Sequence, residues 1–156
     1  MNPKSKAVGV DTSLTNTGVY WGEGCWEEIK GKKLRGTERL QMFYDEFTRI
    51  FRHINPDIAV IEGYAFGARS RHHRLGELGG VVRVALRAAG CVSIYEVPPT
   101  SLKLYATGSG RAGKDEMLAS AEEAEGFLPP SHDVADAIWL WRAGVDPEFD
   151  LTKWLY

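Results

Sequence analysis

Cysteine is scarce in this chain of 156 residues, and its scarcity argues against two kinds of scaffold. Cys25 and Cys91 are the only cysteines, and they lie far apart in the sequence. They do not show the short spacing that a structural zinc site requires. We therefore expect neither a disulfide framework nor a cysteine-ligated metal, and a hydrophobic core has to supply the stability.

Long apolar runs are missing as well. No stretch approaches the roughly 18 apolar residues that a membrane-spanning helix needs, and the first residues, MNPKSK, lack the apolar segment of a signal peptide. Internal repeats, low-complexity segments and long linkers are absent. With 44% hydrophobic and 26% charged residues, the composition is that of a globular protein. We expect one domain over residues 1–156, inside the cell and without a membrane partner.

The net charge of −2 hides an uneven distribution along the chain. Residues 1–114 carry 17 Lys and Arg against 11 Asp and Glu, whereas residues 115–156 carry 2 against 10. The segment 66–114 alone has 8 basic and 2 acidic residues. Two solvated faces of opposite sign would explain this pattern, and so would a polyanion-binding surface beside an acidic metal site.

Hydrophobic periodicity predicts an α/β fold with a mixed sheet of five strands flanked by helices. Strands are indicated at 6–13, 17–21, 25–29, 57–62 and 92–97. The first three follow one another as in an antiparallel meander, and the later two alternate with helices, as parallel strands do. Thr37 and Ser131 are the expected N-caps of the first and last helix. The helices are predicted at 37–54, 75–89, 101–105, 114–125 and 131–143.

Four acidic residues occupy positions at which a carboxylate would cost folding free energy unless it has a functional role. Asp11 ends the first apolar strand and Glu62 ends the fourth. Asp133 and Asp136 lie three residues apart, on one face of the last predicted helix. Carboxylates from these places can converge, and a divalent cation would relieve their repulsion. Mg²⁺ prefers all-oxygen ligands, and one or two ions can clamp the attacking and leaving oxygens of a phosphodiester.

Each acid also has an ordinary explanation. Asp11 could begin a turn, Glu62 could face solvent, and Asp133 could favour the positive end of a helix. Asp136 is harder to explain in this way, because apolar residues surround it in the segment VADAIWL. The presence of all four favours metal-dependent hydrolysis of a phosphodiester.

Five segments of the sequence follow one another in a specific order and spacing. They are GVDTSLTNTG (9–18), VIEGYAF (60–66), LGELGGVV (75–82), VPPTSLKLYATGSGRAGKDEM (97–117) and HDVADAIWLW (132–141). Together they span roughly residues 6–142, and their order resembles RuvC-type Holliday-junction resolvases, in particular the small phage and bacterial members. The resemblance implies an RNase H-like fold and a homodimer that cuts four-way DNA junctions with Mg²⁺ or Mn²⁺. It also implies a bacterial or phage-infected cytoplasm as the location.

The same resemblance assigns roles residue by residue. It implies that four acids hold the metal: Asp11, Glu62, Asp133 and Asp136. It implies that Lys103 and Lys114 lie near the scissile phosphate, where positive charge stabilises the pentacovalent transition state. Many bacterial members have Pro-Gly after the first acid, where this chain has TSL, and their segment after the second acid is about one residue longer. These departures leave the preferred branched substrate and any cleavage-site sequence open.

Residues 64–74 interleave aromatic rings with cations, a mixture that suits nucleic acid. Cations neutralise phosphates, and rings stack on bases that are exposed where a duplex opens, as at a branch point. The DNA-binding candidates in this loop are Tyr64, Phe66, Arg69, Arg71 and Arg74. Lys103, Arg111 and Lys114 extend the predicted DNA surface. The alternative is a solvated loop whose rings fold back on the core.

Two other motifs point to different chemistry and are weaker. Residues 108–114 fit the G-x-x-x-x-G-K of a P-loop, but Asp115 stands where Ser or Thr should bind Mg²⁺. The loop also follows a predicted helix instead of a strand, so we expect no nucleotide triphosphate there. The first hairpin also looks like that of actin-like ATPases and sugar kinases, which need far more than 156 residues.

The predicted function is a metal-dependent, structure-selective endodeoxyribonuclease that cuts branched DNA and leaves 5′-phosphate nicks. Its predicted partners are branched DNA and a second copy of the chain. One alternative is another RNase H-like nuclease with relaxed specificity for branched DNA or RNA–DNA hybrids. The other is a junction-binding module that does not cleave.

Overall fold

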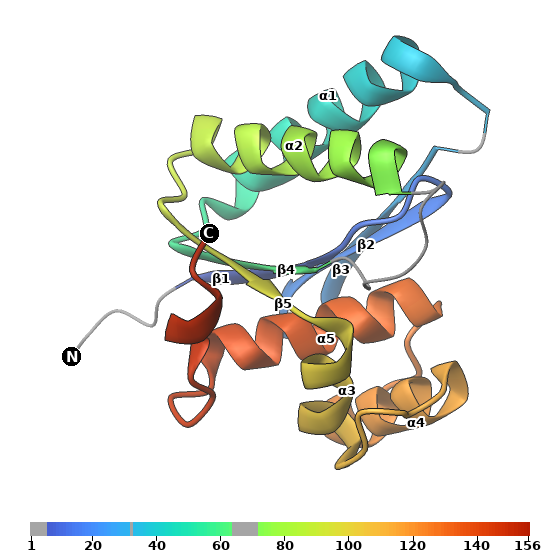
Figure 1. Cartoon of the computed structure of the whole chain (residues 1–156), viewed down its shortest axis with the longest axis vertical. Helices are drawn as coiled ribbons and strands as arrows, with labels where there is room; N and C mark the ends of the chain where they lie inside the picture. The colour runs from blue at the N-terminus through green and yellow to red at the C-terminus, as the bar shows by residue number, and fades with distance from the viewer. Residues whose placement is uncertain (1–5, 32, 64–71) are drawn as a thin grey trace.

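A five-stranded mixed sheet forms the centre of the computed structural model, which describes residues 6–31, 33–63 and 72–156 (Figure 1). The strands are β1 (Ala7–Asp11), β2 (Asn16–Gly22), β3 (Cys25–Lys30), β4 (Ile58–Glu62) and β5 (Ser93–Val97). Their order in the sheet is β3-β2-β1-β4-β5. β1, β2 and β3 pair antiparallel, whereas β4 pairs parallel with both β1 and β5. The predicted α/β fold with a mixed sheet is therefore confirmed.

Helices cover both faces of this sheet. One face carries α1 (Gly36–Ile54) and α2 (His72–Ala88) (Figure 1). The other carries α5 (His132–Val145), with α3 (Pro99–Thr107) and α4 (Lys114–Glu125) packed beside it. A 3-10 helix, η1 (Leu151–Trp154), follows α5, and the chain then returns to β5, where the Tyr156 N–H donates to the Ile94 carbonyl. No helix in the described part of the chain is both long and apolar enough to cross a membrane.

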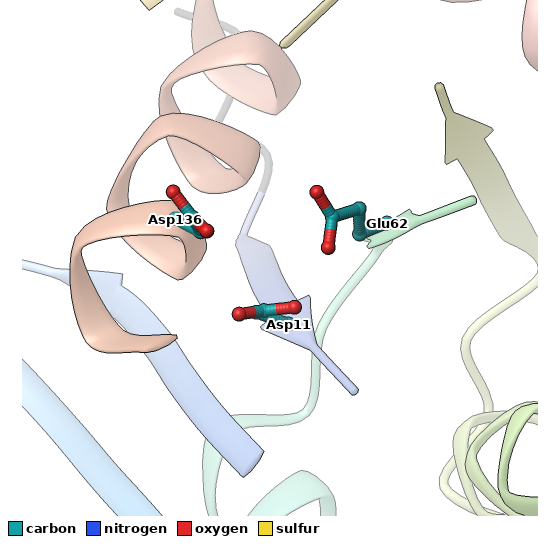
Figure 2. Close-up of side chains that lie close together, drawn as sticks. All are labelled: Asp11, Glu62 and Asp136. Atoms are coloured by element: carbon teal, nitrogen blue, oxygen red, sulfur yellow. The ribbon is translucent and has the colours of Figure 1, made fainter. Parts of the chain in front are cut away.

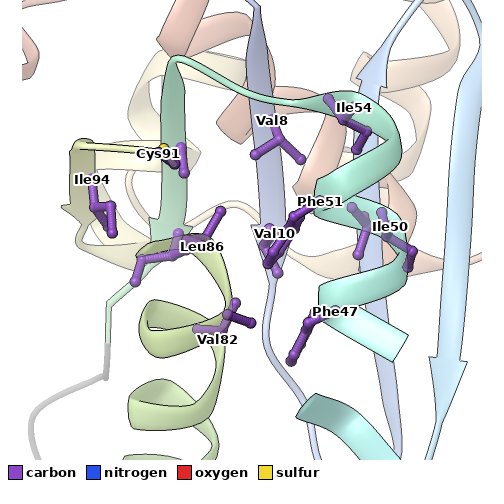
Figure 3. Packing of buried hydrophobic residues seen from close by; sticks show 14 of the residues in the cluster. Val8, Val10, Phe47, Ile50, Phe51, Ile54, Val82, Leu86, Cys91 and Ile94 are labelled. Carbon is purple, nitrogen blue, oxygen red and sulfur yellow. The ribbon is translucent and has the colours of Figure 1, made fainter. Parts of the chain in front are cut away.

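The main core lies between the sheet and the layer of α1 and α2. Apolar residues recur every three or four positions along α1, so that one side of this helix faces the sheet. The buried residues on that side are Phe43, Phe47, Ile50, Phe51 and Ile54. Figure 3 shows the last four of them against Val8 and Val10 of β1 and Leu86 of α2. Each fully buried side chain of this kind contributes about 1.5–3 kcal/mol, so this core holds the strands that carry the site.

Helix α5 packs closely on the opposite face because two glycines of the sheet leave room for its backbone. A Cβ on Gly9 of β1 would lie 2.1 Å from the carbonyl oxygen of Ala137. A Cβ on Gly18 of β2 would lie 2.3 Å from the carbonyl oxygen of Asp133. No side chain fits at such distances, so these glycines set how near α5 comes to β1.

Most predicted elements are confirmed with ends shifted by a few residues. α4 has the predicted bounds, and Ser131 caps α5, since its hydroxyl accepts the Val134 N–H at 3.2 Å. The prediction of Thr37 as a cap is wrong: α1 begins at Gly36, and its N-cap is the extended backbone of Arg35 without a side-chain hydrogen bond. Because no side chain caps α1, the sequence offers no capping residue from which the start of this helix could be predicted.

Two further helix starts differ from the prediction. α2 begins three residues earlier than expected, at His72, because a polar first turn continues the helix without adding to the apolar pattern. α3 begins at Pro99, where proline is favoured in the first turn because its missing N–H is not needed there. The short helix η1 has no counterpart in the prediction, because four residues are too few to show a period.

Candidate active site

Three of the four predicted acids meet at one edge of the sheet. Asp11 is the last residue of β1, Glu62 is the last residue of β4, and Asp136 lies one turn into α5. One carboxylate oxygen of each residue lies within 4.8 Å of the others. Figure 2 shows the three side chains approaching a common space from these three elements. We call Asp11, Glu62 and Asp136 the acid trio.

The pairing of the strands explains how two members of the acid trio meet. Neighbouring parallel strands end at the same edge of a sheet, which is where ligands bind in open α/β sheets. The register places Val10 beside Ile61, so the next residues, Asp11 and Glu62, emerge together. Asp136 reaches them because the glycines of β1 and β2 let α5 lie close to the sheet.

Burial and mutual repulsion disfavour the charged forms of the acid trio. Asp11 is only 6% exposed, and its burial raises its pKa well above the ordinary value, with the charges of Glu62 and Asp136 adding to the effect. Burial also raises the pKa of Glu62. Burial, followed by the charge of Glu62, raises the pKa of Asp136 to about 7. A nearby positive charge therefore stabilises this cluster.

Two predicted lysines supply part of that positive charge. Lys103 of α3 lowers the pKa of Glu62 and of Asp136. Lys114, the first residue of α4, lowers the pKa of Asp136 as well. Neither ammonium group forms an ion pair with another described residue. Both lysines therefore lie within electrostatic range of the acid trio and are available to an anionic ligand.

The fourth predicted acid, Asp133, lies beside the acid trio. Its charge raises the pKa of every member of the trio. Its Oδ2 accepts a hydrogen bond of 2.8 Å from Nδ2 of Asn16, and the same nitrogen donates one of 2.7 Å to Oε1 of Glu28. The closest group of ligand atoms does not include Asp133, so its role as a metal ligand stays a prediction.

The glycine-rich segment 108–113 joins α3 to α4 and leads to Lys114. Nδ1 of His132 lies 3.2 Å from the carbonyl oxygen of Lys114, which ties the start of α4 to the start of α5. The N–H of Gly113 donates to Oε2 of Glu116 at 2.7 Å and so completes the first turn of α4. The segment follows a helix, whereas a P-loop follows a strand. Arg111 is exposed in it, and its contact with DNA stays a prediction.

Most of the predicted DNA-binding loop lies outside the described residues. The positions concerned are Tyr64, Phe66, Arg69 and Arg71. Arg74 belongs to α2 by its backbone, but its side chain is outside the description as well. Gly63, the residue before this loop, donates its N–H to the Val97 carbonyl at 2.8 Å, beside the acid trio. DNA binding by these five side chains stays a prediction.

Four residues that shape the site were not predicted from the sequence. Gly9 and Gly18 had a usable signal, because a glycine inside a strand pattern marks a close approach of another backbone. Asn16 and Glu28 had none. Asn16 lies 12 positions from Glu28 and 117 positions from Asp133, and no local pattern links residues so far apart.

The acid trio fits a hard divalent cation. Its atoms are all carboxylate oxygens, the ligand type that Mg²⁺ and Ca²⁺ prefer. They lie close enough together to bind one ion jointly. Their burial and raised pKa values leave repulsion that such an ion would relieve.

Two relatives found by comparison with known proteins carry the same name. Models of known protein families give no match. Crossover junction endodeoxyribonuclease RuvC of Anaeromyxobacter sp. (strain Fw109-5) is 38% identical over 104 residues, which are 66% of this chain and 50% of that protein. The protein of the same name from Prochlorococcus marinus (strain MIT 9312) is 31% identical over 144 residues, 85% of this chain and 91% of that protein. The chain spans about half the length of the Anaeromyxobacter relatives that it matches.

A solved structure shares the fold. RuvC of T. thermophilus in complex with a Holliday junction substrate aligns with a TM-score of 0.74 over 88% of this chain and 90% of that chain, at 22% identity. At this identity the likeness concerns the fold. The predicted RNase H-like arrangement, a mixed sheet flanked by helices, is thereby confirmed.

Proposed function

The chain belongs to the RuvC family, and from this premise we propose that it is a metal-dependent endonuclease that cleaves branched DNA, four-way junctions in particular. The acid trio carries the proposal, because one buried and two partly buried carboxylates converge where two parallel strands end. The names of the curated relatives, crossover junction endodeoxyribonuclease, support the reaction class. The fold likeness to a RuvC bound to a Holliday junction supports the substrate class.

The acid trio and Asp133 would hold one or two Mg²⁺ ions, with Mn²⁺ as a substitute. Such ions, when bound, supply Lewis acidity for the attack of water and for the departing oxygen. The protein supplies preorganisation: Asp11 and Glu62 project from two hydrogen-bonded strands, and Asp136 projects from a helix packed against them. Three rigid elements therefore fix the carboxylates before the substrate arrives.

The reaction would be hydrolysis of one phosphodiester bond. A water oxygen forms the new bond to phosphorus, the bond from phosphorus to the 3′ oxygen breaks, and the 3′ oxygen takes up a proton. The products are a 5′-phosphate and a 3′-hydroxyl, which a ligase can rejoin. Lys103 and Lys114 would face the phosphate, where their charge stabilises the additional negative charge of the transition state.

The chain would act on DNA as a homodimer. Symmetric cutting of two strands at a four-way junction requires two acid clusters, and the described residues of one chain contain one such cluster. The basic residues between 66 and 114 would contact the DNA backbone, and Tyr64 and Phe66 would stack on bases at the branch point. Because the substrate is cellular DNA, the activity would be cytoplasmic. Residues 1–156 would form one nuclease domain, since Asp11 and Asp136 come from its two ends.

A cleavage assay with matched substrates tests the proposal. Four-way, three-way, flap and linear DNA and a linear RNA–DNA hybrid are incubated with the protein in Mg²⁺ or in EDTA. We expect cleavage of branched DNA in Mg²⁺ only. Asp11→Asn should abolish it and leave junction binding intact or tighter, because a negative charge beside DNA is removed. Asp150→Asn, which changes an exposed acid on η1's N-cap, is the matched control.

Three outcomes of this assay would contradict the proposal. Cleavage by Asp11→Asn at the wild-type rate would show that the acid trio is not the catalytic site. Equal cleavage of the linear hybrid would favour another RNase H-like nuclease. Tight binding without cleavage by the wild type would favour a non-cleaving junction-binding module.

The DNA surface has a separate test in the salt dependence of binding. Each lost phosphate contact should reduce the slope of log affinity against log salt by about 1. The double variant Arg69→Ala/Arg71→Ala should therefore bind a junction more weakly and with a smaller slope. Arg52→Ala is the control, because Arg52 is exposed in the last turn of α1, at the sheet edge opposite the acid trio. An unchanged slope in the double variant would place DNA on another surface.

A further inference from the structure

A polar link joins the edge of the sheet to the start of α5, next to the acid trio. It consists of Asn16 at the start of β2, Glu28 of β3 and Asp133 in the first turn of α5. The side-chain nitrogen of Asn16 donates one hydrogen to Glu28 at 2.7 Å and the other to Asp133 at 2.8 Å. Only the amide nitrogen can face two carboxylates, because the amide oxygen is itself an acceptor.

The link is not arranged for stability alone. Oδ1 of Asn16 is buried and has no hydrogen-bond partner among the described residues. A buried acceptor without a partner costs free energy of folding. A leucine or valine at this position would avoid that cost, so the use of an amide here has to be explained by what its two hydrogens hold.

Glu28 holds Asn16 from the neighbouring strand β3. It accepts the second amide hydrogen of Asn16, and against the opposing effect of its burial the hydroxyl of Ser131, the N-cap of α5, helps to lower the pKa of Glu28. The backbone of Asp133 rests directly against Gly18 of the same strand as Asn16. The first turn of α5 is thus attached to β2 through backbone contact and through the hydrogen bond from Asn16 to Asp133, and Asn16 is in turn held by Glu28 of β3.

One carboxylate oxygen of Asp133 has no hydrogen-bond donor among the described residues. Asn16 occupies Oδ2, and Oδ1 accepts no hydrogen bond from any residue that the structure describes. Asp133 lies three residues before Asp136 and so on the same side of α5. This carboxylate is held through one oxygen, has no described donor on the other, and lies near enough to three further acids for its charge to raise their pKa values. It is arranged as a ligand with an orienting partner.

We propose that Asn16, supported by Glu28, is a positioning residue that makes Asp133 the fourth ligand of the metal cluster. The inference rests on the proposed function, because Asp133 needs positioning only if the cluster holds a metal. Partners that orient a metal ligand typically change metal affinity or activity by 10–100-fold when they are removed. We therefore expect Asn16 to act on metal binding and on cleavage, and to leave folding and junction binding largely unchanged.

The test measures metal binding separately from cleavage. The thermal midpoint of each variant is followed in EDTA and during a titration with Mg²⁺, and single-turnover cleavage of a four-way junction is measured at each Mg²⁺ concentration. For Asn16→Ala we expect a midpoint in EDTA close to that of the wild type. The Mg²⁺ concentration for half-maximal shift and for half-maximal cleavage should rise about 10–100-fold.

Two substitutions at Glu28 separate positioning from a structural role. Glu28→Gln keeps an oxygen that accepts the amide hydrogen of Asn16, so its Mg²⁺ dependence should stay near that of the wild type. Glu28→Ala removes this acceptor and should shift the Mg²⁺ dependence in the direction of Asn16→Ala. Gln41→Ala is the matched control, because it removes an exposed amide-to-carboxylate hydrogen bond of 2.9 Å, to Asp45 on α1.

The outcomes distinguish this inference from the proposed function. The inference would be overturned if Asn16→Ala kept the Mg²⁺ dependence of the wild type. It would also be overturned if Asn16→Ala and Glu28→Gln both lowered the thermal midpoint in EDTA. If the wild type shifts with Mg²⁺ but cleaves no branched DNA, the proposed function fails, and the shift of Asn16→Ala still decides the role of Asn16. A wild type without any Mg²⁺-induced shift would overturn both.

Discussion

Replacing Asp136 by asparagine should stabilise the metal-free protein although it should abolish cleavage. Asp136 lies in the acid trio, where burial and the charge of Glu62 disfavour its ionised form. Asparagine has nearly the same shape and no charge, so the variant keeps the packing of α5 and loses the repulsion. A residue whose removal raises stability and ends activity is typical of a site whose geometry serves function.

The magnitude follows from the pKa of Asp136, which is about 7 in the folded protein against 3.8 ordinarily. Because the folded state holds this proton more tightly, the unfolded state loses it first as the pH rises. Stability therefore falls between about pH 4 and pH 7 and stays low above. One pKa unit corresponds to about 1.4 kcal/mol, so Asp136→Asn should gain about 2–4 kcal/mol at pH 8, since neighbouring carboxyls share part of the shift.

Urea unfolding in EDTA measures this gain. The difference in free energy of unfolding between Asp136→Asn and the wild type should be positive at pH 8 and less than about half as large at pH 5. Asp150→Asn is the control of opposite sign, because hydrogen bonds from Thr152 lower the pKa of Asp150, and its replacement should not stabilise. No gain at pH 8, or an equal gain at both pH values, would refute the reasoning that charge repulsion strains the empty acid trio.

Two further predictions concern the packing of α5 and the role of the lysines. Gly18→Ala should lower the free energy of unfolding by at least about 1–3 kcal/mol and reduce cleavage, because a Cβ there would push α5 and Asp136 away from the sheet. Gly80→Ala, with open space around its Cβ, should raise stability by about 0.5–1 kcal/mol in urea unfolding, and the reverse order of the two variants would contradict the packing argument. Lys103→Ala and Lys114→Ala should slow single-turnover cleavage at saturating protein by a larger factor than they weaken junction binding; a loss of affinity alone would contradict their role in the transition state.

Much of the fold could be predicted because its signals are local. The apolar face of α1 follows from residues three and four positions apart, and the existence of β1 follows from a run of apolar residues. Where the local signal is absent, the prediction fails. Arg35 caps α1 through its backbone alone, so Thr37, whose hydroxyl is a common N-cap, was the natural but wrong choice.

The candidate site was predictable in its composition and less so in its arrangement. Asp11 and Glu62 could be expected to meet, because both end strands of a parallel pair. The different positions of Asp133 and Asp136 could not be expected from their spacing, since both lie on one face of α5. They differ because Asn16 takes an oxygen of Asp133, whereas Asp136 faces the strand ends directly.

By itself the sequence determined the order of strands and helices and the placement of acids at their ends, because alternation, helical spacing and end residues are properties of neighbouring positions. Tertiary structure alone decided the distances. Gly9 and Gly18 bring α5 to the sheet, and Asn16 reaches Asp133 across 117 positions of chain. Such contacts depend on how whole layers pack against one another, and no single stretch of residues determines that packing.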